Sequence, residues 1–161
     1  MTRILGIDPG LSGALCLYDT VSRNMKVWDM PTLNITRNSK KKRIIDLTAL
    51  ALIVDGNRNE IDHAIIELVG ARPGESPVAS FSFGFSAGCV QMVVAANFIP
   101  YTLVTTSVWK RAMKLTDDKD SSRQQASRLF PEHAGLWVRV NDDGRAEAAL
   151  LARDHEKEGV L

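Results

Sequence analysis

Two short apolar runs in this chain each end in a carboxylate. Residues 4–7 read Ile-Leu-Gly-Ile and lead into Asp8, and residues 64–66 read Ala-Ile-Ile and lead into Glu67. Apolar runs of this length are typical of buried strands. A carboxylate at the end of a buried strand loses hydration unless a cation or a hydrogen-bond donor meets it. The chain must therefore fold so that both strand ends face solvent or a cleft.

The spacing of the apolar runs predicts an α/β fold. Strands are expected at residues 4–8, 14–18 and 24–28, which lie so close together that an antiparallel meander is predicted. Two later strands are expected at residues 64–67 and 101–104. The predicted helices span residues 44–55, 80–98, 108–113, 121–130 and 142–158. This order of elements gives a mixed five-stranded sheet flanked by helices.

Two segments without regular periodicity are expected to be loops. Residues 32–43 are polar and basic, and residues 69–78, which directly follow Glu67, are rich in glycine and proline. With 161 residues, the chain is long enough for one sizeable core and too short for two. We therefore expect a single domain over residues 1–161.

Positive charge gathers in two segments, although the net charge is only +1. Hydrophobic residues make up 45% and charged residues 24%, which is ordinary for a globular protein. One basic segment covers residues 40–43, and the other covers residues 109–123. A local basic patch can bind a polyanion whatever the total charge. For the second segment, a solvated helix face is the alternative interpretation.

Apolar length and cysteine content indicate a cytoplasmic protein. No apolar stretch is expected to reach the roughly 18 to 20 residues that a membrane span needs, and the N-terminus shows no signal-peptide pattern. Cys16 and Cys89 lie in apolar contexts and form no CxxC pair. We expect reduced core thiols rather than a disulfide.

The longest apolar segment, residues 80–98, predicts a buried helix. Phe81, Phe85 and Met92 recur at helical spacing. Gly84 and Gly88 lie one turn apart, where the missing side chains would let another helix approach closely.

A second pair of carboxylates opens the last predicted helix. Asp143 and Glu147 are four residues apart, so on a helix their side chains share a face. Stabilisation of a helix N-terminus, worth roughly 0.3 to 1 kcal/mol, explains Asp142 and Asp143. It does not explain Glu147, whose neighbours are small or apolar, so a ligand role is favoured there.

Carboxylates that converge on one place repel each other, and a hard divalent cation relieves that repulsion. The pattern therefore indicates magnesium-dependent phosphodiester chemistry. Turn capping by Asp8 before Pro9-Gly10 is the simpler alternative. The same tract also resembles the phosphate loop of sugar kinases and actin-like ATPases, which need two such domains. The three histidines, at positions 63, 133 and 155, lack metal-ligand spacing.

Five motifs, taken in order, resemble those of the RuvC-type Holliday junction resolvases, and the resemblance covers nearly the whole chain. They are residues 4–10, the strand end 65–67, the Gly84/Gly88 helix, residues 108–111 with Lys119, Asp120 and Arg123, and the Asp-Gly-Arg-Ala-Glu-Ala close at 143–148. The segment 40–43 and that close resemble the phage-borne or prophage branch more than the bacterial housekeeping enzyme.

The resemblance implies a ribonuclease H-like fold and a homodimer formed through the helix around Phe81 and Met92. It also implies paired cuts in four-way DNA junctions by two Mg²⁺ ions, with Mn²⁺ as a substitute, leaving 5′-phosphate and 3′-hydroxyl ends. The implied catalytic and metal-binding residues are Asp8, Glu67, Asp143 and Glu147. Asp142 is the alternative to Asp143, because the family places its third ligand three residues before the last one, where this chain has Gly144.

The two basic segments supply the residues predicted to hold DNA phosphates. They are Lys110, Arg111, Lys114, Lys119, Arg123, Lys41 and Lys42. Bacterial members place an aromatic residue just after the second catalytic carboxylate, whereas residues 68–73 here read Leu-Val-Gly-Ala-Arg-Pro. No residue is therefore assigned a stacking role at the junction centre, and a helicase partner is left open.

Three alternatives stay open from the sequence. The chain could be a broader nuclease that debranches forks and flaps as well as junctions. It could be a junction-binding protein without cleavage, or a nucleotide-binding fragment of the actin-like kind.

Overall fold

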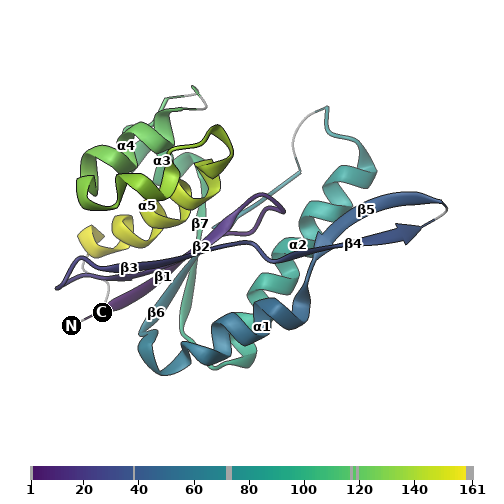
Figure 1. The fold of residues 1–161 in the computed structure, drawn as a ribbon, viewed down its shortest axis with the longest axis horizontal. Coiled ribbons are helices and arrows are strands. Elements are labelled where there is room, and N and C mark those ends of the chain that lie inside the picture. Colours follow the sequence, from purple (N-terminus) through teal and green to yellow (C-terminus); the bar gives the residue numbers. More distant parts are fainter. Residues whose placement is uncertain (1, 38, 72–73, 117, 119, 159–161) are drawn as a thin grey trace.

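The computed structural model describes residues 2–37, 39–71, 74–116, 118 and 120–158 (Figure 1). Its main sheet has the strand order β3-β2-β1-β6-β7. The strands are β1 (Arg3–Asp8), β2 (Ala14–Asp19), β3 (Met25–Asp29), β6 (His63–Leu68) and β7 (Tyr101–Thr105). The first three are antiparallel, and β6 and β7 run parallel to β1. The predicted mixed five-stranded sheet and its antiparallel meander are confirmed.

Helices cover both faces of this sheet (Figure 1). One face carries α3 (Thr106–Ala112), α4 (Ser121–Leu129) and α5 (Asp143–Glu158), and the other carries α1 (Leu47–Gly56) and α2 (Pro77–Ala96). Short 3₁₀ turns complete the chain: η1 (Arg58–Glu60), η2 (Pro131–Trp137) and η3 (Val140–Asp142). The predicted helices are confirmed as elements, and their ends differ by up to three residues.

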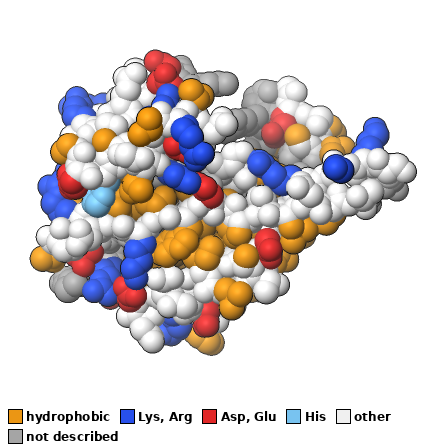
Figure 2. Space-filling view, in the orientation of Figure 1, with side chains coloured by type: hydrophobic (Ala, Val, Ile, Leu, Met, Phe, Trp, Pro, Cys, Tyr) orange, Lys and Arg blue, Asp and Glu red, His pale blue; other side chains and the backbone are white. Residues whose placement is uncertain are grey.

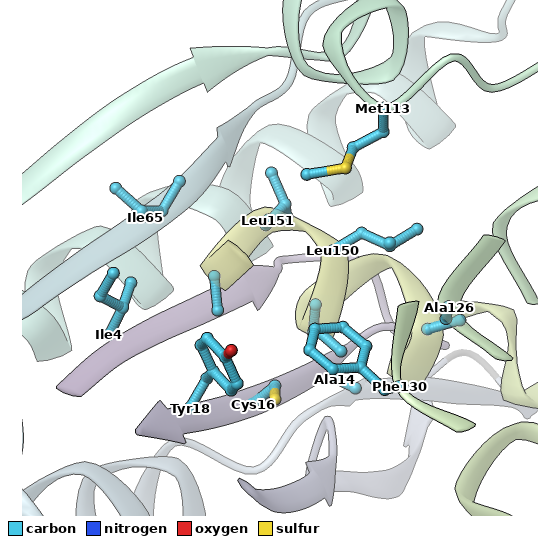
Figure 3. Close-up of a cluster of buried hydrophobic side chains, with 14 of the residues drawn as sticks. Ile4, Ala14, Cys16, Tyr18, Ile65, Met113, Ala126, Phe130, Leu150 and Leu151 are labelled. Carbon is cyan, nitrogen blue, oxygen red and sulfur yellow. The ribbon is translucent and has the colours of Figure 1, made fainter. Parts of the chain in front are cut away.

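Alternate residues of the central strands supply two separate cores. Ile4, Cys16 and Tyr18 pack with Leu150 and other residues of the α3–α5 side (Figure 3). Leu5, Ile7, Leu15 and Leu17 pack on the opposite side with α1 and α2. Side chains alternate between the faces of a strand, so a run of apolar residues fills both cores at once.

The helix α5 lies unusually close to β1. A Cβ added at Gly6 would overlap the carbonyl oxygen of Ala148 and lie 2.7 Å from the amide nitrogen of Ala152. Only a residue without a side chain allows this approach. Gly6 therefore sets how closely α5, which carries Asp143 and Glu147, packs on the sheet.

The segment predicted as the first loop is instead a hairpin. Strands β4 (Thr32–Arg37) and β5 (Lys40–Ile45) pair antiparallel in a sheet of their own, which projects from the body (Figure 1). The predicted helix start at residue 44 was also wrong, because Asp46 caps α1 by accepting a hydrogen bond from the Ala49 amide at 3.0 Å. The run of cations hid the alternation of Leu33 and Ile35 with polar residues, which is the period of a strand.

The helix α2 is only partly buried, contrary to the prediction of a buried helix. Ala87, Val90 and Val94 face the core, whereas Phe81 is 73% exposed and Met92 is 66% exposed. No atom lies within 4 Å of a Cβ added at Gly84 or Gly88, so no helix in the described part of the chain approaches them.

By length and composition alone, α2 could also cross a membrane. The expectation that no apolar stretch reaches that length was therefore wrong. A single helix of this kind is a weak indication of a membrane span, because interface and core helices of globular proteins pass the same test.

Both cysteines are free thiols, as predicted. Cys16 is fully buried in the core, and burial raises its thiol pKa to about 12. Cys89 is partly buried on α2, and burial also raises its pKa.

Candidate active site

Two of the predicted carboxylates lie next to each other because β1 and β6 are parallel neighbours. Ile7 pairs with Ile66, so Asp8 and Glu67 follow at the same edge of the sheet. The side chains of two such residues meet outside the carboxyl ends of the strands, where open α/β sheets commonly bind ligands.

The start of α5 brings the other two carboxylates to the same edge. A Cβ added at Gly144 would lie 2.5 Å from the Ser12 carbonyl oxygen, so α5 begins against the turn that follows Asp8. Asp143 is the first residue of the helix, and Glu147 lies one turn further on.

The electrostatics of Asp8 show that the four carboxylates form one group. Burial is the main cause that raises the pKa of the Asp8 carboxyl, and a hydrogen bond from the Gly10 amide at 3.1 Å opposes it. The negative charges of Glu67, Glu147 and Asp143 add to the rise, and together these effects bring the pKa to about 7. Glu67, Asp143 and Glu147 are also the three residues that the sequence analysis grouped with Asp8. Like charges at close range disfavour each other's ionised form.

Glu67 is held in place by two donors from α3, the helix that follows the neighbouring strand β7. Its Oε1 accepts a hydrogen bond from Thr106 Oγ1 at 2.7 Å and another from Trp109 Nε1 at 3.2 Å. Glu67 is 7% exposed, and Trp109 is fully buried. The sequence analysis did not identify these donors, because they reach Glu67 only through the pairing of β6 with β7.

Glu147 forms an ion pair with a lysine of the same chain. Its Oε1 lies 2.8 Å from Lys110 Nζ and accepts a hydrogen bond from Ser122 Oγ at 2.9 Å. The ammonium of Lys110 also lies 5.3 Å from the centre of the Trp109 ring. Lys110, predicted to hold DNA phosphates, therefore lies within the carboxylate group.

Asp142 and Asp143 have different surroundings. The Asp142 carboxylate is buried and forms an ion pair with Arg139 at 2.7 Å, and hydrogen bonds from Arg139 lower its pKa. Asp143 Oδ1 accepts a hydrogen bond from the adjacent Gly144 amide at 3.1 Å, and its charge acts on Asp8. Of the two candidates for the third ligand, Asp143 is the one whose charge raises the pKa of Asp8.

The donor set suits a hard divalent cation, although its members are engaged elsewhere in this arrangement. Among the described residues, no three His, Cys, Asp or Glu side chains already surround a point that one ion could occupy. Glu67 and Glu147 point their oxygens at Trp109 and Lys110. Four carboxylates at one edge of the sheet are nevertheless the kind of all-oxygen donor set that Mg²⁺ prefers.

An open hollow of about 630 Å³ lies beside Asp143. Its lining includes Ser12, Arg43, Arg139, Asn141 and Asp143. A polymer bound at the carboxylates therefore has a path away from them.

The remaining basic residues predicted to bind DNA differ in exposure and in their contacts. Arg111 and Lys114 are exposed near the site, and Lys41 is exposed on the hairpin, whose projecting end carries Lys and Arg side chains (Figure 2). Lys42 is half-buried on the other face of the hairpin. Arg123 is occupied by the Val138 carbonyl oxygen at 3.0 Å and by Asp120. Lys119 lies outside the described residues.

Comparisons with known proteins identify the fold. No family model and no curated protein sequence matches the chain. The Thermus thermophilus RuvC structure matches with a TM-score of 0.60 and 14% identity over 98% of this chain and 97% of that one. T. thermophilus RuvC in complex with a Holliday junction substrate gives 0.59 and 12%, over 99% and 97%. The yeast mitochondrial Holliday junction resolvase Ydc2 gives 0.52 and 16%, over 95% and 77%. The chain thus has the ribonuclease H-like fold of RuvC, as predicted.

Proposed function

We propose that this chain is a RuvC-type endonuclease that resolves four-way DNA junctions by metal-dependent hydrolysis of phosphodiester bonds. The observation that carries the proposal is that four carboxylates meet at one edge of the sheet. Asp8 and Glu67 end neighbouring parallel strands, and α5 begins with Asp143 against the turn after Asp8 and carries Glu147 one turn later. The fold that holds this group is shared with RuvC bound to a Holliday junction and with a mitochondrial junction resolvase.

The proposed metal ligands are Asp8, Glu67, Asp143 and Glu147, holding two Mg²⁺ ions or Mn²⁺ in their place. Metal ions bound there would activate the attacking water and stabilise the leaving 3′ oxygen, giving 5′-phosphate and 3′-hydroxyl products. Thr106 and Trp109 orient Glu67 through its Oε1. Lys110 must leave Glu147 Oε1 or share it when the cation binds.

Paired cuts need two active sites related by symmetry, so the proposal includes a homodimer. The exposed apolar face of α2 is the surface that supports it. Val78, Phe81, Phe85 and Met92 are between 56% and 73% exposed, and the rings of Phe81 and Phe85 stack at 6.5 Å. Apolar patches of this kind commonly mark interfaces.

The proposed DNA contacts are cations that reach phosphates without reading bases. Arg111 and Lys114 would flank the cut site, and Lys41 and Lys42 would act from opposite faces of the hairpin. Lys119 stays a predicted phosphate contact. Binding of this kind releases counterions, so the affinity should fall steeply with salt.

Cleavage of a synthetic four-way junction in Mg²⁺ tests the proposal. Wild-type protein should make symmetric paired nicks, whereas the Asp8→Asn and Glu67→Gln variants should bind the junction without cutting it. Linear duplex is the control substrate. Equal cutting of a replication fork would instead identify a broader debranching nuclease.

The alternative of a junction-binding protein without cleavage is favoured by one observation. Lys110 neutralises Glu147, and no described carboxylate trio is already arranged for an ion. Junction binding with no nick in Mg²⁺ or Mn²⁺ would establish that alternative.

A further inference from the structure

We propose that the hairpin of β4 and β5 is an arm that grips one duplex of the branched substrate, beyond the bond that is cut. This inference rests on the proposed function, because it extends the same DNA path outward from the carboxylates. It assigns to one face of the hairpin a set of phosphate contacts that begins at the candidate active site.

The register of the hairpin defines that face. Asn34 pairs with Arg43, and Thr36 pairs with Lys41. Cross-strand partners and alternate residues share a face, so these four side chains point to the same side. All four are exposed. Lys42 and its partner Ile35 lie on the opposite face.

A hydrogen bond ties this face to the candidate active site. Arg43 Nη2 donates to Ser12 Oγ at 2.7 Å, and Ser12 lies in the turn that follows Asp8. Lys41 lies two residues further out along the same strand. The two cations therefore mark a line that starts beside the carboxylates and runs outward.

The hollow beside Asp143 continues this line. Arg43, Arg139 and Asn141 all line it. A DNA backbone that leaves the site past Asp143 through this hollow would pass two arginines before it reaches Lys41.

The charge of the hairpin selects a polyanion as the occupant. Residues 30–45 contain five basic residues and no Asp or Glu. Within the described residues, none of the cations at positions 40–43 forms an ion pair with a carboxylate. Unneutralised cations in a row raise the local potential and attract phosphates.

The shape of the hairpin also suits duplex DNA. A two-stranded ribbon fits the major groove. Residues two apart on an antiparallel strand are about 6.8 Å apart. Measured along the DNA helix axis, this spacing equals two steps of the roughly 3.4 Å rise per phosphate of one strand. Lys41 and Arg43 can thus contact phosphates on the same strand.

Junction binding by a double variant tests the arm. Lys41→Gln with Arg43→Gln removes two charges from the proposed face. The control variant, Lys26→Gln with Arg58→Gln, removes two positive charges from exposed positions at the other end of the sheet. There Glu60 forms ion pairs with Lys26 and with Arg3, the first residue of β1. Binding is measured by fluorescence anisotropy without divalent metal, over a range of salt concentrations.

The arm predicts a specific change in salt dependence. Two lost phosphate contacts should reduce the slope of log affinity against log salt by about 1.8 and weaken binding by up to about 60-fold at 0.1 M salt. The control pair should keep the wild-type slope. On a junction with shortened arms, the slope of the wild type should fall by the same amount. The slope of the hairpin variant should be the same on the short and the long junction.

The outcomes separate the arm from the proposed function. If the wild type nicks junctions while the hairpin variant binds with the slope of the control pair, the arm is overturned and the function stands. If the hairpin variant shows the reduced salt slope while the wild type never nicks a junction, the proposed arm is supported and the proposed nuclease function is rejected. Wild-type protein that binds no DNA would overturn both.

Discussion

At the scale of single residues, Asp8 has the most perturbed carboxyl group of the site. Burial and three neighbouring carboxylates raise its pKa to about 7. In the unfolded chain the same group ionises near pH 4. Between these values the unfolded chain has lost a proton that the folded chain still holds, so the free energy of unfolding falls as the pH rises and levels off above about 7.

We therefore predict that metal-free Asp8→Asn protein is more stable than the wild type at pH 8, by up to about 4 kcal/mol, and that the difference shrinks towards pH 4. Urea unfolding in EDTA across this range measures it, with Asp55→Asn at an exposed position as the control. At pH 8, added Mg²⁺ should stabilise the wild type and leave Asp8→Asn unchanged. A wild type that grows more stable from pH 5 to pH 8 would contradict the prediction.

Lys110 is the second residue whose role can be measured. Because its ammonium occupies Glu147 at 2.8 Å, it competes with a bound cation. Lys110→Met should bind Mn²⁺ several-fold more tightly in calorimetry, since Glu147 is then free. Loss of a partly exposed ion pair should cost the metal-free protein only about 1 kcal/mol. Weaker Mn²⁺ binding by the variant would show that Lys110 supports the metal site instead.

The residues of the site were predictable in identity but not in their contacts. Asp8 and Glu67 could be placed together because each ends an apolar strand. The donors Thr106 and Trp109 lie 39 and 42 residues from Glu67, and only the pairing of β6 with β7 brings them near. The choice between Asp142 and Asp143 depends on Arg139, whose position no local pattern reveals.

At the scale of elements, the contact between α5 and β1 fixes the geometry of the site. Gly6→Ala should push α5 away from the sheet, because the added methyl group meets the backbone at Ala148 and Ala152. We predict a loss of about 1–3 kcal/mol in unfolding free energy, measured by chemical denaturation. Gly56→Ala, at the end of α1 with no atom within 4 Å of the added carbon, should change stability by less than about 0.5 kcal/mol. Equal effects at both positions would contradict the role of Gly6.

The strands of the main sheet were predictable because their apolar runs are short and uninterrupted. The hairpin of β4 and β5 was not, since cations occupy both of its faces and no core side chain beyond Ile45 marks its period. The burial of α2 was also misjudged. Its apolar residues surround the whole helix, and a single chain covers only the face with Ala87, Val90 and Val94.

At the scale of the whole molecule, the uncovered face of α2 predicts self-association. Phe81→Glu combined with Met92→Glu should convert a dimer into a monomer in sedimentation equilibrium, because two charges would be buried at the interface. Val21→Glu, at a position 69% exposed on the turn between β2 and β3, is the control and should remain dimeric. A wild type that sediments as a monomer at micromolar concentration would contradict the proposed interface.

If the proposed dimer forms through this exposed face, chain abundance controls the proposed activity. When two chains must meet before both strands of a junction can be cut, the concentration of complete enzyme below the dimer Kd rises with the square of the chain concentration. Halving the amount of protein would then leave about a quarter of the paired cuts. For the proposed nuclease, gene dosage alone would thus keep paired cutting low until enough copies accumulate.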